Sequence, residues 1–167
     1  MQVEVRRART SDIKAIRALV DTYTADRRLL SKATVTLYEQ VQEFWAAADA
    51  ETGQVVGCGA LHVMWEDLAE IRTVAVDPAY RGRKIGHRIV TELLDVAREL
   101  GVARVFCLTF ETRFFGSFGF AEIDGAPVPH GVYEQLLRSY DEGVAEFLDL
   151  ERVKPNTLGN TRMLLHL

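Results

Sequence analysis

The sequence lacks long apolar runs. Among its 167 residues, no stretch approaches the roughly 18 consecutive apolar residues that a membrane-spanning helix needs. The first ten residues, MQVEVRRART, alternate and carry charge, whereas the core of a signal peptide is a continuous apolar segment. We therefore expect no membrane span, no leader and a cytoplasmic location.

Cysteine is scarce and a strong net charge is missing. The two cysteines, Cys58 and Cys107, lie far apart in apolar stretches, without the spacing of a CxxC redox pair or of a zinc site. We expect two buried free thiols in a reducing compartment. Because the four histidines are scattered over different segments, we expect no metal site. A net charge of −4 argues against binding to nucleic acid or to an anionic membrane.

The features that are present are typical of one globular domain. Hydrophobic residues make up 48% of the chain and charged residues 26%, which are the proportions of an ordinary soluble protein. A chain of this length buries a sizeable core without being divided. We therefore expect a single domain over residues 1–167.

Hydrophobic periodicity predicts strands that alternate with helices. Strands are expected at residues 3–5, 55–65, 68–76, 104–110, 118–123 and 161–167. Helices are expected at residues 13–23, at 37–45 after a start near Thr34 or Thr36, at 85–100 before Gly101, and at 113–117. Residues 127–156 mix helical spacing with glycine and proline and receive no assignment. Since several strands are joined by turns too short for a crossover helix, the sheet should be mixed.

One stretch places a basic turn directly before a helix. In VDPAYRGRKIGHRIV, residues 76–90, three cations fall between positions 81 and 84 and the helix begins near residue 85. Free N–H groups and the helix dipole suit such a place to an anion, above all to phosphate. It is not a P-loop, since Gly86 is followed by His87, and Gly82 with Gly86 lacks the dinucleotide spacing. An ordinary surface turn is the alternative.

The same stretch resembles the coenzyme-binding turn of the GNAT acetyltransferases. Their pattern is an apolar strand, Asp-Pro, an aromatic residue and Arg/Gln-x-x-Gly-x-Gly/Ala; VAVDPAYRGRKIG matches it except at Lys84, which replaces a glycine. The resemblance implies an α/β (α+β) GNAT fold, with a mixed, mostly antiparallel twisted sheet of six to seven strands and helices on both faces. It also implies acetyl-CoA as the co-substrate. The residues expected to hold acetyl-CoA are Val74, Ala75, Val76, Arg81, Gly82, Arg83, Lys84, Ile85, Gly86, His87 and Phe115.

A second stretch, ETRFFGSFGF, resembles the short helix that precedes the sixth strand of the family. Phe115 stands where many members have a tyrosine that protonates the departing CoA thiolate. The acid must therefore differ, and Thr112, with Thr109 as the alternative, is the candidate. Glu70 is the candidate base, because the attacking amine must lose a proton. A solvated or salt-bridged glutamate is the alternative for Glu70.

The segments LLSKATVTLYEQVQEFW and GNTRMLL resemble bacterial N-acetylglutamate synthases, in particular their short stand-alone members. This resemblance implies acetylation of the α-amino group of L-glutamate, the first step of arginine biosynthesis. The two carboxylates of glutamate need cations or N–H donors when they leave water. The candidate substrate-binding residues are Lys32, Arg72, Thr73, Asn160, Thr161 and Arg162.

Several alternatives stay open. Some synthases have an arginine where this chain has Gly159, so glutamine is a second candidate acceptor. Another small amine or a protein amine would change the acceptor and keep the fold. The missing tyrosine also allows a non-catalytic acyl-CoA-binding regulatory module. Each candidate cation is equally explained as a solvated surface charge, and the resemblance is compatible with a homodimer.

Overall fold

The structure, a computed structural model, describes residues 2–24, 32–157 and 159–167. The strands of this part of the chain form one mixed sheet. The strands are β1 (Val3–Arg7), β2 (Phe44–Asp49), β3 (Val55–Trp65), β4 (Leu68–Val76), β5 (Arg104–Thr109), β6 (Ala121–Glu122) and β7 (Thr161–His166). Within these described residues the sheet has seven strands in the order β1-β2-β3-β4-β5-β7-β6. Strands β4 and β5 are parallel, whereas β1–β2, β2–β3, β5–β7 and β6–β7 are antiparallel pairs. The mixed, mostly antiparallel sheet is confirmed.

Most of the expected helices are also confirmed. The α-helices are α1 (Ile13–Thr24), α2 (Thr34–Glu39), α3 (Ile85–Leu100), α4 (Thr112–Gly116), α5 (His130–Leu136) and α6 (Glu142–Phe147). The 3-10 turns are η1 (Thr10–Asp12), η2 (Val41–Glu43), η3 (Pro78–Tyr80) and η4 (Glu151–Asn156). Helices α5 and α6 and the turn η4 occupy the stretch that had no assignment. Over the described ranges, none of these helices is long and apolar enough to cross a bilayer.

The prediction of a helix over residues 37–45 is wrong in its second half. Helix α2 ends at Glu39, and Phe44 and Trp45 begin strand β2. The prediction rested on the helical spacing of the apolar residues Leu37, Tyr38, Val41, Phe44 and Trp45. Strands β1 and β3 pair with FWAAAD from both sides, and this tertiary pairing overrides the local pattern. The strand expected at residues 118–123 is likewise reduced to Ala121–Glu122.

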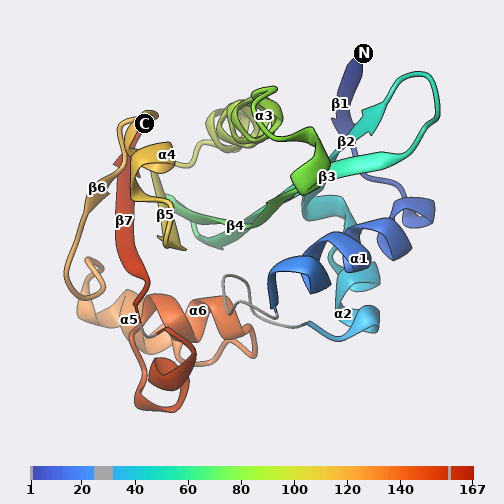
Figure 1. Ribbon diagram of the computed structural model, residues 1–167. Helices are drawn as coiled ribbons and strands as arrows, with labels where there is room; N and C mark the ends of the chain where they lie inside the picture. The colour runs from blue at the N-terminus through green and yellow to red at the C-terminus, as the bar shows by residue number, and fades with distance from the viewer. Residues whose placement is uncertain (1, 25–31, 158) are drawn as a thin grey trace. The chain divides into compact units, whose positions relative to one another are not determined.

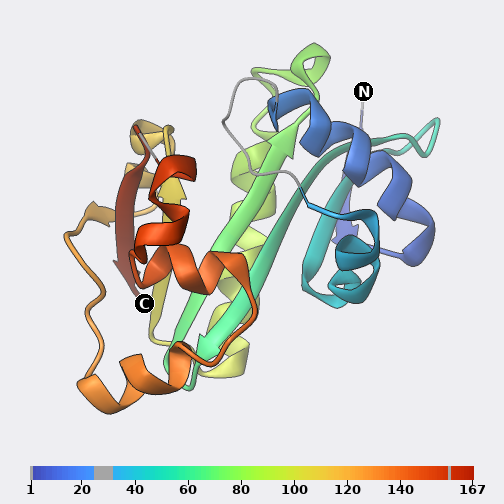
Figure 2. The ribbon, with the colours of Figure 1, turned by 90° about the horizontal axis from the view of Figure 1, so that it is seen from below.

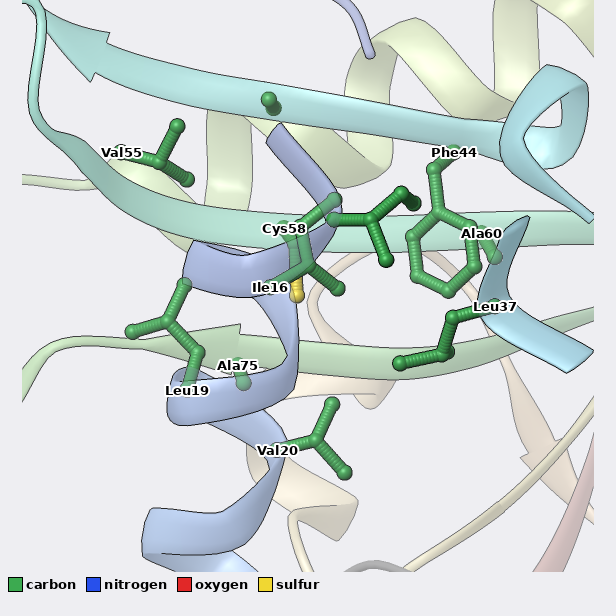
Figure 3. Packing of buried hydrophobic residues seen from close by; sticks show 11 residues of the cluster. Ile16, Leu19, Val20, Leu37, Phe44, Val55, Cys58, Ala60 and Ala75 are labelled. Atoms are coloured by element: carbon green, nitrogen blue, oxygen red, sulfur yellow. The ribbon is translucent and has the colours of Figure 1, made fainter. Parts of the chain in front are cut away.

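The chain divides into two compact units, Met1–His62 with Ile71–Glu99 and Val63–Glu70 with Leu100–Leu167. In the first unit, α1 and α2 cover one face of β2 and β3, and α3 covers the other (Figure 1). Cys58 and Ala60 of β3 pack on the first face with Ile16 and Leu37 (Figure 3). The expected helices on both faces are present in this unit. A single domain over residues 1–167 stays a prediction.

The second unit has a core of its own. The rings of Phe106 in β5 and Phe147 in α6 pack edge to face, with centroids 5.1 Å apart. Around them cluster Met64, Leu68, Leu136, Val144, Leu148 and Leu164. Figure 2 shows the orange helix α6 beside the dark red strand β7. The segment without a sequence assignment therefore supplies part of the core of this unit.

Two glycines of β3 allow α3 to lie close to the sheet. A Cβ atom added to Gly59 would lie 2.8 Å from Ile89 Cγ2, and one added to Gly57 would lie 3.0 Å from Ile85 Cγ2. Such short distances leave no room for a side chain on this face of β3. Because Ile85 is the first residue of α3, the glycines fix where this helix begins relative to β3.

We expect Gly59→Ala to lower the free energy of unfolding by about 1–3 kcal/mol, because the added methyl group would press against Ile89. Urea unfolding followed by circular dichroism measures the change. Gly116→Ala in α4 is the matched control, since nothing lies within 4 Å of a Cβ atom added there. An equal loss of stability in both variants would contradict this explanation.

Candidate active site

The turn between β4 and α3 is shaped by hydrogen bonds within the chain. Asp77 caps η3, with its Oδ1 accepting from the N–H of Ala79 at 2.9 Å and its carbonyl accepting from the N–H of Tyr80 at 2.8 Å. The guanidinium of Arg83 lies over the ring of Tyr80, 5.2 Å from its centroid. Arg81, Gly82, Arg83 and Lys84 are all exposed. The turn is therefore structured and open to solvent.

Positive φ angles at two positions bring the chain into the helix. Gly82 has φ 79° and nothing within 4 Å of an added Cβ atom. Lys84 has φ 58°, so this lysine adopts the left-handed conformation for which the family pattern has glycine. Its carbonyl accepts from the N–H of Arg88 at 3.0 Å, which begins the hydrogen bonding of α3.

This turn suits a diphosphate. The first N–H groups of a helix have no partner within the helix, and here they follow three exposed cations. The space at Gly82 lets a ligand approach the backbone without meeting a side chain. Gly86 and His87 lie in the first turn of α3 and Ile85 is buried beneath it. These residues fit the diphosphate of coenzyme A.

The middle of β4 departs from regular strand geometry at Thr73. This buried, β-branched residue has φ 58°, a conformation that costs about 1–3 kcal/mol. Its carbonyl accepts a hydrogen bond from the thiol of Cys58 on β3 at 3.4 Å. Just after β4, the N–H of Asp77 donates to the carbonyl of Val56 on β3 at 2.8 Å. An irregularity of this kind disrupts the hydrogen-bond ladder locally and is common next to active sites.

Glu70 lies on the part of β4 that belongs to the second unit. Its side chain is 3% exposed, and the residue is in register with Phe106 on the parallel strand β5. Burial, together with the charge of Glu70, holds the pKa of the Cys107 thiol well above its usual range. Glu70 is therefore a buried carboxylate on β4, and by this position it remains the candidate general base.

Arg162 of β7 is held by backbone carbonyl groups. Its Nη1 donates to the carbonyl of Glu146 at 2.7 Å, and its Nη2 donates to the carbonyls of Phe147 and of Gly125, the latter at 2.7 Å. The guanidinium lies over the ring of Phe106, 5.1 Å from its centroid. Desolvation lowers the pKa of Arg162, and the charges of nearby carboxylates oppose that shift. Two of its nitrogens therefore bind backbone carbonyl groups, and the role of Arg162 as a substrate cation stays a prediction.

Among the described residues of the second unit, two buried side-chain atoms have no hydrogen-bond partner, Asn160 Oδ1 and Arg162 Nε. Asn160 directly precedes β7 and Arg162 is the second residue of that strand, so both belong to one strand end. Asn160 Oδ1 is a hydrogen-bond acceptor, and Arg162 Nε is a donor. Buried atoms of this kind are rare in folded proteins and are often satisfied by a ligand or an ordered water.

The remaining candidate residues lie as follows. In the first unit, Lys32 precedes α2 and its Nζ is 3.4 Å from Gln40 Oε1, while Arg72 is partly buried on β4. In the second unit, Thr112 is exposed at the start of α4, and Thr161 is in register with Thr109.

The candidate acid Thr109 and the aromatic Phe115 have partners within the second unit. Thr109 Oγ1 accepts from the N–H of Glu111 at 2.8 Å. Phe115 is buried, with the rings of Phe114 and Phe120 packed edge to face against it. Both thiols are buried and free, as expected. Over the described residues, no group of three or more His, Cys, Asp or Glu side chains is arranged to hold a metal ion.

Three of these features were not predicted from the sequence. They are the backbone turn at Thr73, its contact with Cys58, and the carbonyl partners of Arg162. The only local signal was the placement of Cys58 between two glycines of a buried strand. That signal indicated a close approach of other elements and not a hydrogen bond.

Comparison with known proteins gives consistent matches. The acetyltransferase (GNAT) family pattern matches residues 13–122. The chain is 65% identical over 162 residues to an amino-acid acetyltransferase of Mycobacterium tuberculosis, an alignment that covers 96% of this chain and 92% of that one. It is 33% identical over 129 residues to an uncharacterized N-acetyltransferase of Chlorobaculum tepidum, covering 77% of this chain and 82% of that one.

Solved structures give the same result for the fold. A Mycobacterium tuberculosis protein in complex with CoA and NLQ, 65% identical, superposes with a TM-score of 0.95 over 98% of this chain and 99% of that one. N-acetylglutamate synthase from Neisseria gonorrhoeae, complexed with coenzyme A and N-acetyl-glutamate, gives a TM-score of 0.78 at 23% identity. That likeness covers 100% of this chain and 35% of the synthase, and it supports the fold alone.

Proposed function

Because the chain belongs to the acetyltransferase (GNAT) family, we propose that it is an acetyl-CoA-dependent amino-acid acetyltransferase whose acceptor is the α-amino group of L-glutamate. This reaction is the first step of arginine biosynthesis. The single observation that carries the proposal is the buried Glu70 on β4, the same strand that leads into the basic turn before α3. The name of the 65% identical relative supports an amino acid as the acceptor.

The chemistry divides between the side chain of Glu70 and the backbone. Glu70, directly or through a water, takes a proton from the ammonium group of the acceptor. The neutral nitrogen then forms a bond to the thioester carbon, and N–H groups of β4 near Val74 and Val76 donate to the carbonyl oxygen as it gains charge. The C–S bond breaks, the bonded nitrogen gives up its second proton, and the CoA sulfur gains one, with Thr112 as the candidate donor that is reprotonated from this nitrogen. The products are an N-acetyl amino acid and the free thiol of CoA.

Binding of the two substrates uses different residues. The turn at residues 81–87 would hold the diphosphate through N–H groups and cations. Lys32 and Arg72 are the candidate partners of the acceptor carboxylates, since a carboxylate leaving water needs charged donors. Asn160 and Thr161 are the candidate polar contacts.

The proposal is tested by thiol release from acetyl-CoA in the presence of glutamate, glutamine, aspartate or a peptide with a free N-terminus. We expect release with glutamate, accompanied by N-acetylglutamate in the mass spectrum. Release with the peptide alone would replace the proposal by protein acetylation. Binding of acetyl-CoA without release by any amine would indicate a regulatory module.

Glutamine is a second candidate acceptor, favoured by the two unpartnered atoms at β7. A side-chain carboxamide has an N–H donor for Asn160 Oδ1 and a carbonyl acceptor for Arg162 Nε, whereas an ionised carboxylate has acceptors only. A site built around a donor and an acceptor rejects a ligand that leaves one of them buried without a partner. The ratio of kcat/KM for glutamine to that for glutamate decides between the two acceptors.

If glutamine is the acceptor, Asn160→Leu should lower kcat/KM for glutamine about tenfold, since the amide donor loses its partner. The value for glutamate should change much less. Asn156→Leu in η4 is the control, because Asn156 is exposed and carries no assigned role. Equal losses for both acceptors in Asn160→Leu would contradict recognition of the carboxamide.

A further inference from the structure

We propose that Cys58 is a positioning residue, whose thiol holds the β4 backbone around Val74 in the shape that receives the acyl group. This role rests on the proposed acetyl transfer, because it concerns the backbone donors of that reaction. Cys58 touches no substrate in this proposal and acts only through the backbone of β4.

The β4 backbone needs an external restraint at this point. Thr73 has φ 58° in the middle of a strand, although threonine is branched at Cβ and strongly disfavours the left-handed region. A residue persists in such a conformation only where its surroundings determine it. A restraint from β3 is therefore expected at Thr73.

The thiol of Cys58 provides this restraint on both sides of Val74. Sγ donates to the carbonyl of Thr73 at 3.4 Å, and the backbone N–H of Ala75 hydrogen-bonds to the same thiol. A single side chain thus satisfies one acceptor and one donor of β4. The peptide groups between the two contacts belong to Val74, so the thiol fixes their orientation.

The thiol keeps its proton under ordinary conditions. Cys58 is fully buried, and desolvation raises the pKa of its thiol to about 12, although the N–H of Ala75 opposes that shift. At neutral pH the group therefore remains S–H and donates to Thr73. A hydrophobic residue of similar size would fill the space and would leave both backbone groups without this partner.

The first test compares Cys58→Ala with Cys58→Ser in the full chain. We expect Cys58→Ala to lower kcat about tenfold, because small displacements of backbone donors weaken their contact with the reacting oxygen. Calorimetric affinity for CoA should stay within about twofold, because the diphosphate turn is unchanged. Cys58→Ser retains a donor and an acceptor and should recover most of kcat. Equal losses of kcat in the two variants would overturn the proposal.

The second test does not depend on turnover. Hydrogen exchange should become at least tenfold faster at the amides of Val74 to Val76 in Cys58→Ala, and remain unchanged in β5. Cys107→Ala, which removes the other buried thiol, is the control for loss of a thiol and should leave these amides unchanged. Unchanged exchange at residues 74–76 in Cys58→Ala would overturn the role of Cys58. Absence of turnover in the wild type, with faster exchange in the variant, would overturn only the proposed reaction.

Discussion

Glu70→Gln is expected to lower kcat about 10²–10³-fold, because glutamine cannot accept the proton that the acceptor ammonium must lose. Glutamine has nearly the size of glutamate, so the 3% exposed site keeps its packing. Affinity for CoA should remain within about twofold, since the carboxylate does not belong to the turn that is proposed to bind the diphosphate. Steady-state kinetics and calorimetry measure the two quantities separately.

The matched control for this substitution is Glu122→Gln, at an exposed glutamate on the short strand β6. It removes the same charge without changing the buried site, and kcat should stay within about twofold of wild type. A parallel fall of kcat in both variants would assign the effect to net charge. A Glu70→Gln enzyme with full activity would show that another group removes the proton.

The sequence predicted the periodic elements of this fold well, and for a physical reason. Helix α3 presents apolar side chains to one face at a spacing that no strand shares, and Gly101 with φ 84° ends it. The turn before it was also predicted from the sequence, because the proposed binding of a diphosphate depends on backbone N–H groups that a short local motif places. Lys84 carries the left-handed φ that its position required.

Residues 44–49 show where local pattern fails. The sequence FWAAAD is compatible with a helix, and only pairing with β1 and β3 makes it a strand. The same limit applies to the site. The left-handed Thr73 and its partner Cys58 are 15 residues apart in the chain, and no spacing rule relates them. Their contact results from strand pairing, which a single sequence does not specify.

Arg162 illustrates a different limit. The resemblance of GNTRMLL to N-acetylglutamate synthases made it a candidate cation for the substrate, and in the structure two of its nitrogens bind carbonyl groups of Gly125, Glu146 and Phe147. Carbonyl groups have no residue identity, so sequence cannot reveal such partners. Of the guanidinium nitrogens, Nε has no hydrogen-bond partner among the described residues, so it is the candidate donor to a ligand. Only the structure leads to this interpretation.

Arg162→Met is expected to lower the free energy of unfolding by about 3 kcal/mol. Methionine fills similar space over Phe106, but it leaves three carbonyl groups without their charged donor. Nearby buried Glu70 and Glu146 also lose a positive charge, and removing one member of a buried charged group is costly. Urea unfolding, followed by fluorescence and by circular dichroism, measures the change.

Arg152→Met separates this effect from the loss of an arginine in general. Arg152 pairs with Glu142 at 2.8 Å, but both side chains are more than half exposed, and solvent screens their interaction. Its loss should change stability by no more than about 0.5 kcal/mol. A similarly small change in Arg162→Met would mean that water replaces the guanidinium at the three carbonyls. The second unit would then be held by the contacts around Phe106 and Phe147 rather than by Arg162.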